Sequence, residues 1–450
     1  MPTPPKEGSL EAPMRHPVNW RDAAFYDEDA LMKEMERVFD LCHGCRRCVN
    51  LCQAFPTLFD LVDESPTMEM DGVKREDYWK VVDHCYLCDL CFMTKCPYTP
   101  PHEWNIDFPH LMLQAKAVRY KKGDVKRRDK LLTNTDLNGK LLARPLIAPA
   151  VNAVNRLGVA RKLLEGAGGV HHEAWIPPYD SRPLSKRARD RLDRDGVAEA
   201  VGRTRGKVAL FATCFANFNE PQTAEDIIAV FEHNGIPVRL ARYKSCCGMP
   251  KLELGDLQAV DRMKETNIPL LAELVDQGFD LVAPVPSCAL MFRQELPLMY
   301  PDDPQVKKVQ EAFFDPFEYL ALRHREGKLN TEFRNPLGSV VYHAACHQRV
   351  QNFGRKTKEV LSLIPDTQVT AVERCSGHDG TYAVKAECHE HAVKIGRPVA
   401  RQVEAKKADH YGSDCPMAGR HIEHIVHAHD NKGGGRAEHP ITLLRKAYGI

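Results

Sequence analysis

The chain has 450 residues, and its 62 Lys and Arg residues almost match its 61 Asp and Glu residues, which leaves a formal net charge of +1. This balance argues against a nucleic-acid-binding protein, because such proteins carry a strong positive field. No stretch approaches the ~20 consecutive apolar residues of a membrane-spanning helix, and the length allows about two to four domains.

Residues 1–30 are rich in proline and charge and are expected to form a flexible N-terminal arm. This segment lacks the apolar core of a secretory signal peptide. We therefore expect a cytoplasmic protein with reduced thiols, or one that is peripheral on the cytoplasmic face of the inner membrane.

Eight cysteines follow in two runs, each reading CxxCxxC with a fourth cysteine after three or four further residues. The runs are Cys42, Cys45, Cys48 and Cys52, and then Cys85, Cys88, Cys91 and Cys96. This spacing is typical of thiolates that bind cubane iron–sulfur clusters, so two runs predict two 4Fe-4S clusters. Apolar residues at helical spacing in 28–42 and 73–91 predict a helix before each run.

In two-cluster ferredoxins the fourth cysteine of each run binds the other cluster. The predicted ligand sets are Cys42, Cys45, Cys48 and Cys96 for one cluster, and Cys85, Cys88, Cys91 and Cys52 for the second. Structural zinc is an alternative, but three cysteines at strict spacing fit three corners of a cube better than a zinc site. Residues 31–115 are expected to form a helical ferredoxin-type domain.

Residues 116–206 are expected to form a helical, basic linker. Its basic stretches at 118–130 and 182–207 predict solvent-exposed faces. Between them, 141–169 predicts one helix with an apolar side, ended by glycines. We expect this helix to pack on a neighbouring domain, and a peripheral membrane contact is the alternative.

The pattern changes at residue 207, where short apolar or β-branched runs begin to alternate with helical patterns. Such alternation indicates α/β domains with parallel sheets. The three strands predicted in residues 207–330 lead into Cys214, Cys246 with Cys247, and Cys288. Ligands gather at the carboxyl ends of parallel strands, so these four thiols are expected to converge on one site.

The same arrangement recurs in residues 331–450, whose predicted strands lead into Cys346, Cys375 and Cys415. Successive cysteines are 32 and 42 residues apart in the first copy, counted to Cys246, and 29 and 40 residues apart in the second. We interpret this match as an internal duplication.

The four cysteines of the first copy suffice for a further iron–sulfur cluster, and thiols that merely pack as small apolar groups are the alternative. The second copy has only three, so a fourth ligand would come from the first copy or from His343, His347, His378 or Asp414. Near the C-terminus, histidines at helical spacing predict a solvated helix face, with metal binding or proton uptake as alternatives: His421, His424 and His427.

Several motifs make the sequence recognisable: the paired cysteine runs, KSCCGMP at 244–250, HAACH at 343–347, ERCSGHDG at 373–380 and SDCPMAG at 413–419. Over about residues 36–450 the chain resembles a family of iron–sulfur proteins that includes the C subunit of anaerobic glycerol-3-phosphate dehydrogenase, the glycolate oxidase iron–sulfur subunit and heterodisulfide reductase-related proteins. The resemblance implies an α-helical two-cluster ferredoxin domain followed by two α/β (parallel-sheet) cysteine-rich CCG domains.

The resemblance also implies an electron-transfer subunit that relays electrons between a flavoprotein dehydrogenase and quinone or another acceptor. The alternatives are a thiol or disulfide reductase of the heterodisulfide type and an electron donor to a rubrerythrin-like peroxidase. Two departures from the family pattern weaken the reductase alternative: Val285, where a closing CxxC has lost its first thiol, and Ser376, which replaces the second cysteine of CCG. No residue is singled out as catalytic.

Overall fold

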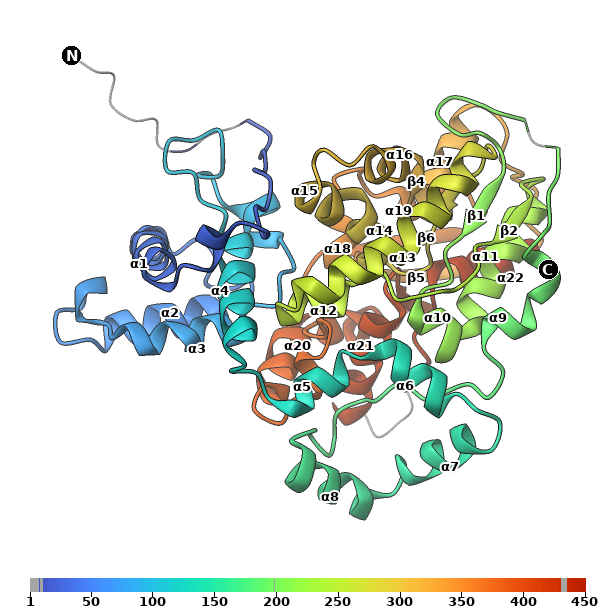
Figure 1. Ribbon diagram of the computed structural model, residues 1–450. Coiled ribbons are helices and arrows are strands. Elements are labelled where there is room, and N and C mark those ends of the chain that lie inside the picture. Colours follow the sequence, from blue (N-terminus) through green and yellow to red (C-terminus); the bar gives the residue numbers. More distant parts are fainter. Residues whose placement is uncertain (1–7, 9–10, 198, 430–434) are drawn as a thin grey trace.

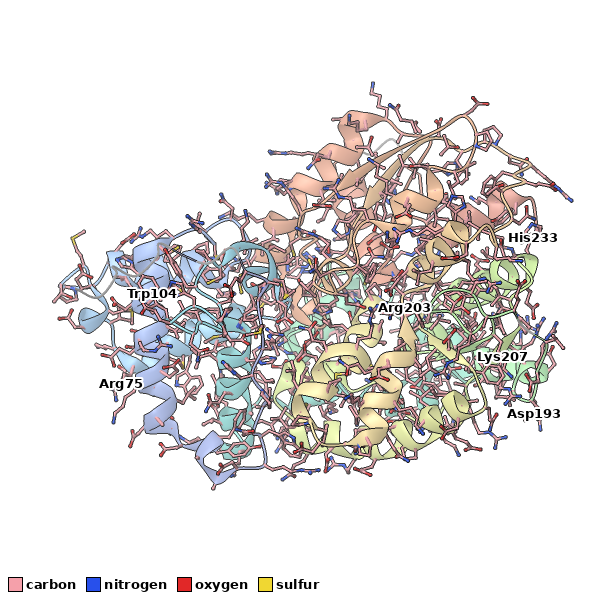
Figure 2. The ribbon with its side chains drawn as sticks, turned by 90° about the horizontal axis from the view of Figure 1, so that it is seen from above. Arg75, Trp104, Asp193, Arg203, Lys207 and His233 are labelled. Carbon is pink, nitrogen blue, oxygen red and sulfur yellow. The ribbon has the colours of Figure 1, made fainter. Side chains whose placement is uncertain are left out.

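The computed structural model describes residue 8 and residues 11–197, 199–429 and 435–450. A helical N-terminal region forms one end of the molecule, and two α/β repeats form the larger remainder (Figure 1). We call residues 207–330 the first repeat and residues 331–450 the second repeat. Figure 2 shows this division from another side, with Arg75 and Trp104 at one end and Asp193 and Lys207 at the other.

Four helices build the N-terminal region: α1 (Glu28–Cys45), α2 (Ala54–Asp63), α3 (Tyr78–His84) and α4 (Phe108–Lys122). The Asp27 side chain starts α1 by accepting a hydrogen bond from the Ala30 amide, which would otherwise lack a partner. Phe55 is buried between the helices and its ring lies 4.7 Å from that of Phe108. Because α1 ends at Cys45 and α3 ends just before Cys85, the packing of the helices positions both cysteine runs.

The segment before α1 is anchored where the structure describes it. Arg15 is buried and donates hydrogen bonds to the carboxylates of Asp89 and Asp107, at 2.6 and 2.9 Å. Its guanidinium also lies 3.5 Å from the carboxylate of Glu295, in the first repeat. The expectation of a flexible arm is therefore wrong for this part of the segment, because one arginine neutralises carboxylates from two parts of the fold.

The linker contains α5 (Arg127–Leu132), α6 (Thr135–Leu142), α7 (Ile147–Val154), α8 (Gly158–Gly168) and α9 (Leu184–Arg187). The single helix expected over 141–169 is thus wrong, since the extended conformation of Leu157 separates α7 from α8. Packing on a neighbouring domain is only partial: Leu146, Val159 and Leu163 are 90%, 76% and 68% exposed, whereas Leu164 lines a cavity shared with both repeats. Among the described residues, no helix is both long and apolar enough to cross a bilayer.

Each repeat contains a parallel sheet, and the two sheets share one strand order. The first sheet has the order β2-β1-β3-β4 and the second has the order β6-β5-β7. The strands are β1 (Val208–Leu210), β2 (Val238–Leu240), β3 (Asp280–Val282), β4 (Phe313–Phe314), β5 (Gly338–His343), β6 (Thr367–Val372) and β7 (His410–Ser413). The six predicted strands are confirmed, whereas β4 was missed because two residues are too few to show a strand period.

The helices of the first repeat are α10 (Cys214–Phe218), α11 (Pro221–His233), α12 (Met249–Leu254), α13 (Leu257–Asp276), α14 (Pro286–Leu290), α15 (Leu296–Met299), α16 (Pro304–Ala312) and α17 (Pro316–Arg325). Those of the second are α18 (Cys346–Arg349), α19 (Lys356–Leu361), α20 (His389–Lys406), α21 (Pro416–His429) and α22 (Pro440–Tyr448). In both repeats a helix follows the central strand at its cysteine, which presents Cys214 and Cys346 at equivalent places.

The parts of the molecule are joined by continuous packing. Leu210 of the first sheet and Tyr342 of the second belong to one buried cluster. On the other side, α4 passes so close to the turn after α12 that a Cβ on Gly255 would lie 2.4 Å from the carbonyl carbon of Lys116. Gly255 has a φ of +84°, so this turn favours glycine for its conformation as well as its size.

Replacement of Arg15 by alanine tests the anchoring of the N-terminal segment. Arg15→Ala leaves buried carboxylates without their cation and is expected to lower the free energy of unfolding by about 3 to 5 kcal/mol. Differential scanning calorimetry at fixed iron content measures the loss. The matched control is Arg21→Ala, because the Arg21 side chain is 62% exposed and its pair with Asp261 lies at the surface. Equal melting temperatures for the two variants would contradict the anchoring role.

Candidate functional site

The first predicted ligand set lies at the end of α1. Burial raises the pKa of the Cys42 thiol well above its usual value, and negative charge on three neighbouring thiolates raises it further: those of Cys96, Cys48 and Cys45. The structure thus brings Cys96 of the second run beside three cysteines of the first.

The second predicted set forms around the loop that follows α3. Burial raises the pKa of the Cys91 thiol, and the neighbouring thiolates that raise it further are those of Cys48, Cys88, Cys85 and Cys52. Cys52, Cys85, Cys88 and Cys91 also line one small cavity. Because Cys48 belongs to the first set, the two sets lie next to each other.

In the first repeat, four thiols gather at the carboxyl end of the sheet. The Sγ atoms of Cys214 and Cys246 are 3.8 Å apart, and the Cys247 thiol makes hydrogen bonds with those of Cys246 and Cys288. Hydrogen bonds from the Cys214 and Cys247 thiols lower the pKa of Cys246 well below its usual value, although burial acts in the opposite direction.

The linker helix α6 holds the loop that carries two of these thiols. The Asp136 carboxylate accepts hydrogen bonds from the Ser245 hydroxyl at 3.0 Å and from the Cys246 amide at 2.9 Å, and it also accepts one from the Tyr243 hydroxyl. No sequence pattern indicated this role, because Asp136 lies more than a hundred residues before the loop it fixes.

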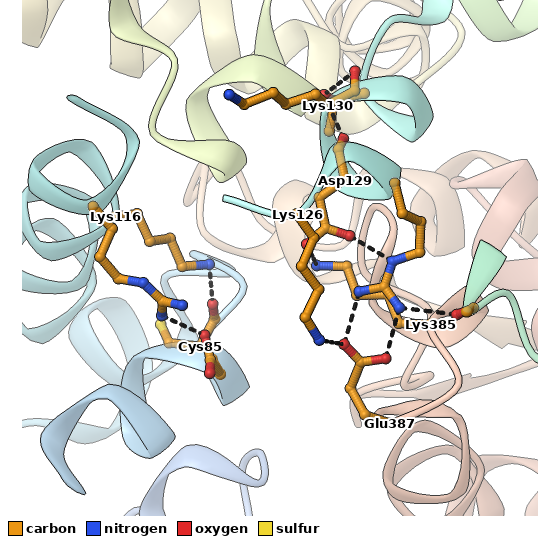
Figure 3. Close-up of polar contacts among 12 residues, drawn as sticks. Cys85, Lys116, Lys126, Asp129, Lys130, Lys385 and Glu387 are labelled. Atoms are coloured by element: carbon orange, nitrogen blue, oxygen red, sulfur yellow. Dashed lines mark hydrogen bonds and ion pairs between the residues drawn. The ribbon is translucent and has the colours of Figure 1, made fainter. Parts of the chain in front are cut away.

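The preceding helix α5 is fastened to the second repeat (Figure 3). Arg128 and Lys126 donate to the Glu387 carboxylate, at 2.7 and 2.8 Å, and Lys385 lies 3.5 Å from the Asp129 carboxylate. The linker is therefore in contact with both repeats.

The second repeat brings its cysteines toward the same region. A hydrogen bond from the Cys346 thiol lowers the pKa of Cys375 to about 6, and the Gly377 amide donates to Cys375 Sγ at 3.3 Å. Burial raises the pKa of Cys415 to about 12, with charge on Asp379 and Cys288 adding to the effect. Cys415 therefore lies within electrostatic reach of a thiol from the first repeat.

One cavity of about 610 Å³ lies between the repeats and the linker. The thiols that line it come from both repeats: Cys214, Cys246, Cys247, Cys288, Cys346 and Cys415. Much of the remaining wall is apolar and includes Leu131, Leu164 and Ile176 of the linker. Burial raises the pKa of Glu253, another lining residue, to about 7, so this carboxyl can exchange a proton near neutral pH.

Tyr86 connects the N-terminal thiols with the second repeat. Its hydroxyl lies 3.5 Å from Cys375 Sγ. Charge on Cys375 also raises the pKa values of the Cys52 and Cys88 thiols, after the larger effect of burial. The second N-terminal set thus lies beside a cysteine of the second repeat, which sequence spacing alone did not indicate.

Three of the four residues considered as extra ligands are engaged elsewhere. His343 is hydrogen-bonded to the Ser413 hydroxyl, and His347 to the Ser287 hydroxyl, both at 2.8 Å. Asp414 accepts hydrogen bonds from the hydroxyls of Tyr342 and Thr357. The fourth candidate, His378, lines the cavity, as does His347.

Asp379 is the acidic group that does lie against a thiol of the second repeat. Its carboxyl is 3.5 Å from Cys375 Sγ. Sequence reasoning missed this residue although it belongs to the recognised ERCSGHDG motif. The predicted solvated face of α21 is correct at His427, which is exposed, and wrong at His421, whose side chain is buried.

Comparison with known proteins identifies relatives of the whole arrangement. A family model of the cysteine-rich domain matches residues 208–293 and again residues 340–422. The C subunit of anaerobic glycerol-3-phosphate dehydrogenase from Escherichia coli (strain K12) is 30% identical over 342 residues, which cover 75% of this chain and 81% of that protein. The chain belongs to the family of this C subunit. This result confirms the resemblance and the two cysteine-rich domains inferred from the motifs.

Two further relatives are less similar to this chain. The B subunit of fumarate reductase (CoM/CoB) from Methanothermobacter marburgensis is 24% identical over 401 residues, covering 86% of this chain and 76% of that protein. Lactate utilization protein A of Bacillus thuringiensis is 26% identical over 208 residues, covering 45% of this chain and 81% of that protein.

One cysteine of this member of the C-subunit family stands apart from the sets described above. Cys388 is buried at the start of α20, and burial raises the pKa of its thiol to about 11. Its neighbouring charges belong to Lys385, Glu387, Asp83 and Arg128, and no other thiol is among them. No motif in the sequence pointed to this position.

Two glycines allow the Cys375 loop to lie directly on α20. A Cβ on Gly377 would be 2.0 Å from the Ala392 carbonyl oxygen, and one on Gly396 would be 2.3 Å from the Ser376 carbonyl oxygen. Such close backbone contact is available only where both facing residues lack a side chain.

Substitution of a helical glycine tests this contact. Gly396→Ala should displace the Cys375 loop and lower the free energy of unfolding by about 1 to 3 kcal/mol, although alanine favours the helix itself. Gly166→Ala in α8 is the matched control, because its Cβ would meet no atom within 4 Å. Thermal unfolding compares the two variants, and a Gly396→Ala protein as stable as Gly166→Ala would contradict the close contact.

Proposed function

We propose that this chain is the iron–sulfur electron-transfer subunit of an oxidoreductase and relays electrons between a flavoprotein dehydrogenase and a quinone. The main support for the proposal is a series of neighbouring thiols that extends, with Tyr86 among them, from the N-terminal region toward the cavity. It runs through the second N-terminal set, past Tyr86, to Cys375, whose Sγ lies 3.5 Å from the Tyr86 hydroxyl. The names of the relatives, which are a dehydrogenase subunit and a reductase subunit, support a role beside a partner subunit.

The eight N-terminal thiols fit two 4Fe-4S clusters. They form two neighbouring sets of four, and in each set burial and adjacent thiolates raise the pKa of the thiols, as at Cys42 and Cys91. Thiolates held this close repel one another unless a positively charged centre binds them, which is what iron supplies. When bound, the clusters provide one-electron transfer, and the protein's part is to hold them beside Tyr86 and Cys375.

The cavity fits a further iron–sulfur group and an organic acceptor beside it. Cys214, Cys246, Cys247 and Cys288 would hold the former, and the second repeat's Cys346, Cys375 and Cys415 lie around or next to the same space. A volume of about 610 Å³ is within the range of cofactor and ligand sites, and the apolar wall suits a quinone ring.

The same cavity reaches a surface suited to a lipid bilayer. Leu164 of α8 lines the cavity, whereas Val159 and Leu163 of the same helix are 76% and 68% exposed. Exposed Arg156 and Lys162 add positive charge beside them. An apolar helix face with flanking cations favours peripheral contact with an anionic membrane, from which a quinone could enter.

The second repeat also carries an observation that favours a disulfide reductase as a second candidate. Cys375 and Cys346 are hydrogen-bonded, and the lowered pKa of Cys375, about 6, would keep it a thiolate at neutral pH in the absence of iron. Thiolates of this kind attack disulfides. Turnover of small disulfides by the reduced, isolated chain would favour this candidate over the quinone.

Cysteine variants test the exchange of ligands between the two runs. We expect anaerobically purified protein to contain at least about eight iron and eight sulfide per chain. Cys96→Ser should remove the cluster held by Cys42, Cys45 and Cys48, and Cys52→Ser the other, as followed by electron paramagnetic resonance after reduction. Cys388→Ser is the control and should keep both signals. Loss of the same signal in Cys96→Ser and Cys85→Ser would contradict the assignment.

Replacement of exposed apolar residues of α8 by glutamate tests the membrane contact. The double variant Val159→Glu, Leu163→Glu should weaken binding to vesicles containing phosphatidylglycerol by at least about tenfold, because two apolar side chains no longer enter the bilayer. Sedimentation with vesicles measures the dissociation constant. Met68→Glu is the control, since Met68 is 64% exposed in the N-terminal region. Unchanged vesicle binding of the double variant would contradict a membrane contact through α8.

A further inference from the structure

Six histidines form a continuous file from the surface of the linker to the cavity. From outside inward they are His172, His171, His389, His424, His421 and His378. Successive ring centroids are 4.7, 4.0, 6.0, 6.3 and 6.1 Å apart. At these spacings each ring touches the next or reaches it through one water molecule. The His172 side chain is 34% exposed at the outer end, and His378 lines the cavity at the inner end.

A buried arginine fixes the backbone of the two outermost histidines. Arg161 donates to the carbonyl oxygens of His171 at 2.7 Å and of His172 at 3.1 Å. The His171 amide in turn donates to the Val384 carbonyl at 2.9 Å, which ties this loop to the second repeat. The His171 and His389 rings consequently stack, with only 16° between their planes.

Several ring nitrogens are free to accept a proton. The Nε2 atoms of His378 and His421 are buried and make no hydrogen bond to any described residue, which is unusual for buried imidazole. His389 donates from Nδ1 to the Ala383 carbonyl oxygen at 2.8 Å, so its Nε2 is an acceptor. These three rings offer accepting nitrogens in the part of the file that solvent does not reach.

Charged groups face the file mainly at its outer end. The Glu165 carboxylate is 2.6 Å from His172 Nδ1. Burial lowers the pKa of His171 and of His424, and the charge on Glu173 offsets part of this effect. Farther in, the neighbours are other imidazoles, and burial lowers the pKa of His378 to about 4 and that of His421 well below its usual value. The resting file is therefore neutral inside, and the carboxylates of Glu165 and Glu173 lie at its outer end.

We propose that this histidine file conducts protons from solvent to the cavity as electrons arrive there. Each electron that reaches the buried thiol region adds one negative charge. One proton that enters at His172 and passes from His378 to the Glu253 carboxylate, which lines the same cavity, compensates this charge. Each ring takes a proton on a free nitrogen and releases one to the next ring. This inference rests on the proposed function, because two such electrons and two protons convert a quinone to a quinol.

The experiment follows proton uptake directly and needs no acceptor. Anaerobic protein in weakly buffered solution is mixed with the methyl viologen radical cation, which gives up one electron and no proton. Loss of the iron–sulfur absorbance reports electron arrival, and a pH indicator reports protons taken from solution. In the wild-type protein we expect alkalinisation to follow reduction closely.

Two substitutions interrupt the file while keeping an aromatic ring in place. His389→Phe and His424→Phe should be reduced at the wild-type rate, but their proton uptake should be about 100-fold slower. His427→Phe is the matched control, since His427 is exposed on the same helix as His424. In His171→Ala, added imidazole should restore the rate of proton uptake, which a purely structural defect would not allow.

The outcomes separate this inference from the function on which it rests. If the absorbance does not change on mixing, the protein is not an electron carrier and both proposals fail. If the protein is reduced without alkalinisation, or if His389→Phe and His424→Phe take up protons as fast as His427→Phe, only the proton path is overturned.

Discussion

Thiols and carboxyls that are buried within reach of one another impose the main physical demand on this molecule. Burial and neighbouring thiolates raise the pKa of Cys42 and Cys91, and buried carboxyls such as Asp379 lie in the same region. So much potential negative charge requires positive charge nearby. The fold meets part of this demand with Arg15, set among three carboxylates, and with Lys116, which lies against Cys85. The four thiols of each N-terminal set could obtain the remaining positive charge from bound metal.

The two repeats share a fold but differ in the residues around their cysteines. Both repeats keep the same central strand order and the cysteine at the end of the central strand. The first keeps the paired Cys246 and Cys247, whereas the second has Ser376 at the equivalent step and sets Asp379 against Cys375. Both repeats contact the N-terminal region, the first through Glu295 and the second through the Cys375 thiol beside Tyr86.

Local sequence patterns predicted the strands, the helices around the cysteine runs and the convergence of cysteines at strand ends, because spacing and periodicity are local properties. Contacts made across the chain were not predictable. Asp136 fixes the Cys246 loop across 110 residues, and Tyr86 meets Cys375 across 289. The prediction for the linker helices failed for a related reason. Apolar residues along one side of a helix indicate that this side avoids water, but they do not indicate whether protein or lipid covers it. His421 was misjudged because its neighbours on α20 and in the Cys375 loop are distant in sequence.

The two sheets share part of their interior, since Leu210 and Tyr342 belong to one cluster, although Val341 and Val399 belong to a second cluster formed within the second repeat alone. A chain cut between the repeats would expose the apolar surface of this shared cluster on both fragments. Mutations that empty one repeat of its cysteines therefore need not unfold it, because its partner continues to support its core. Shared packing of this kind lets a duplicated half lose its original chemistry and survive as scaffold, which is a route by which new internal surfaces can evolve.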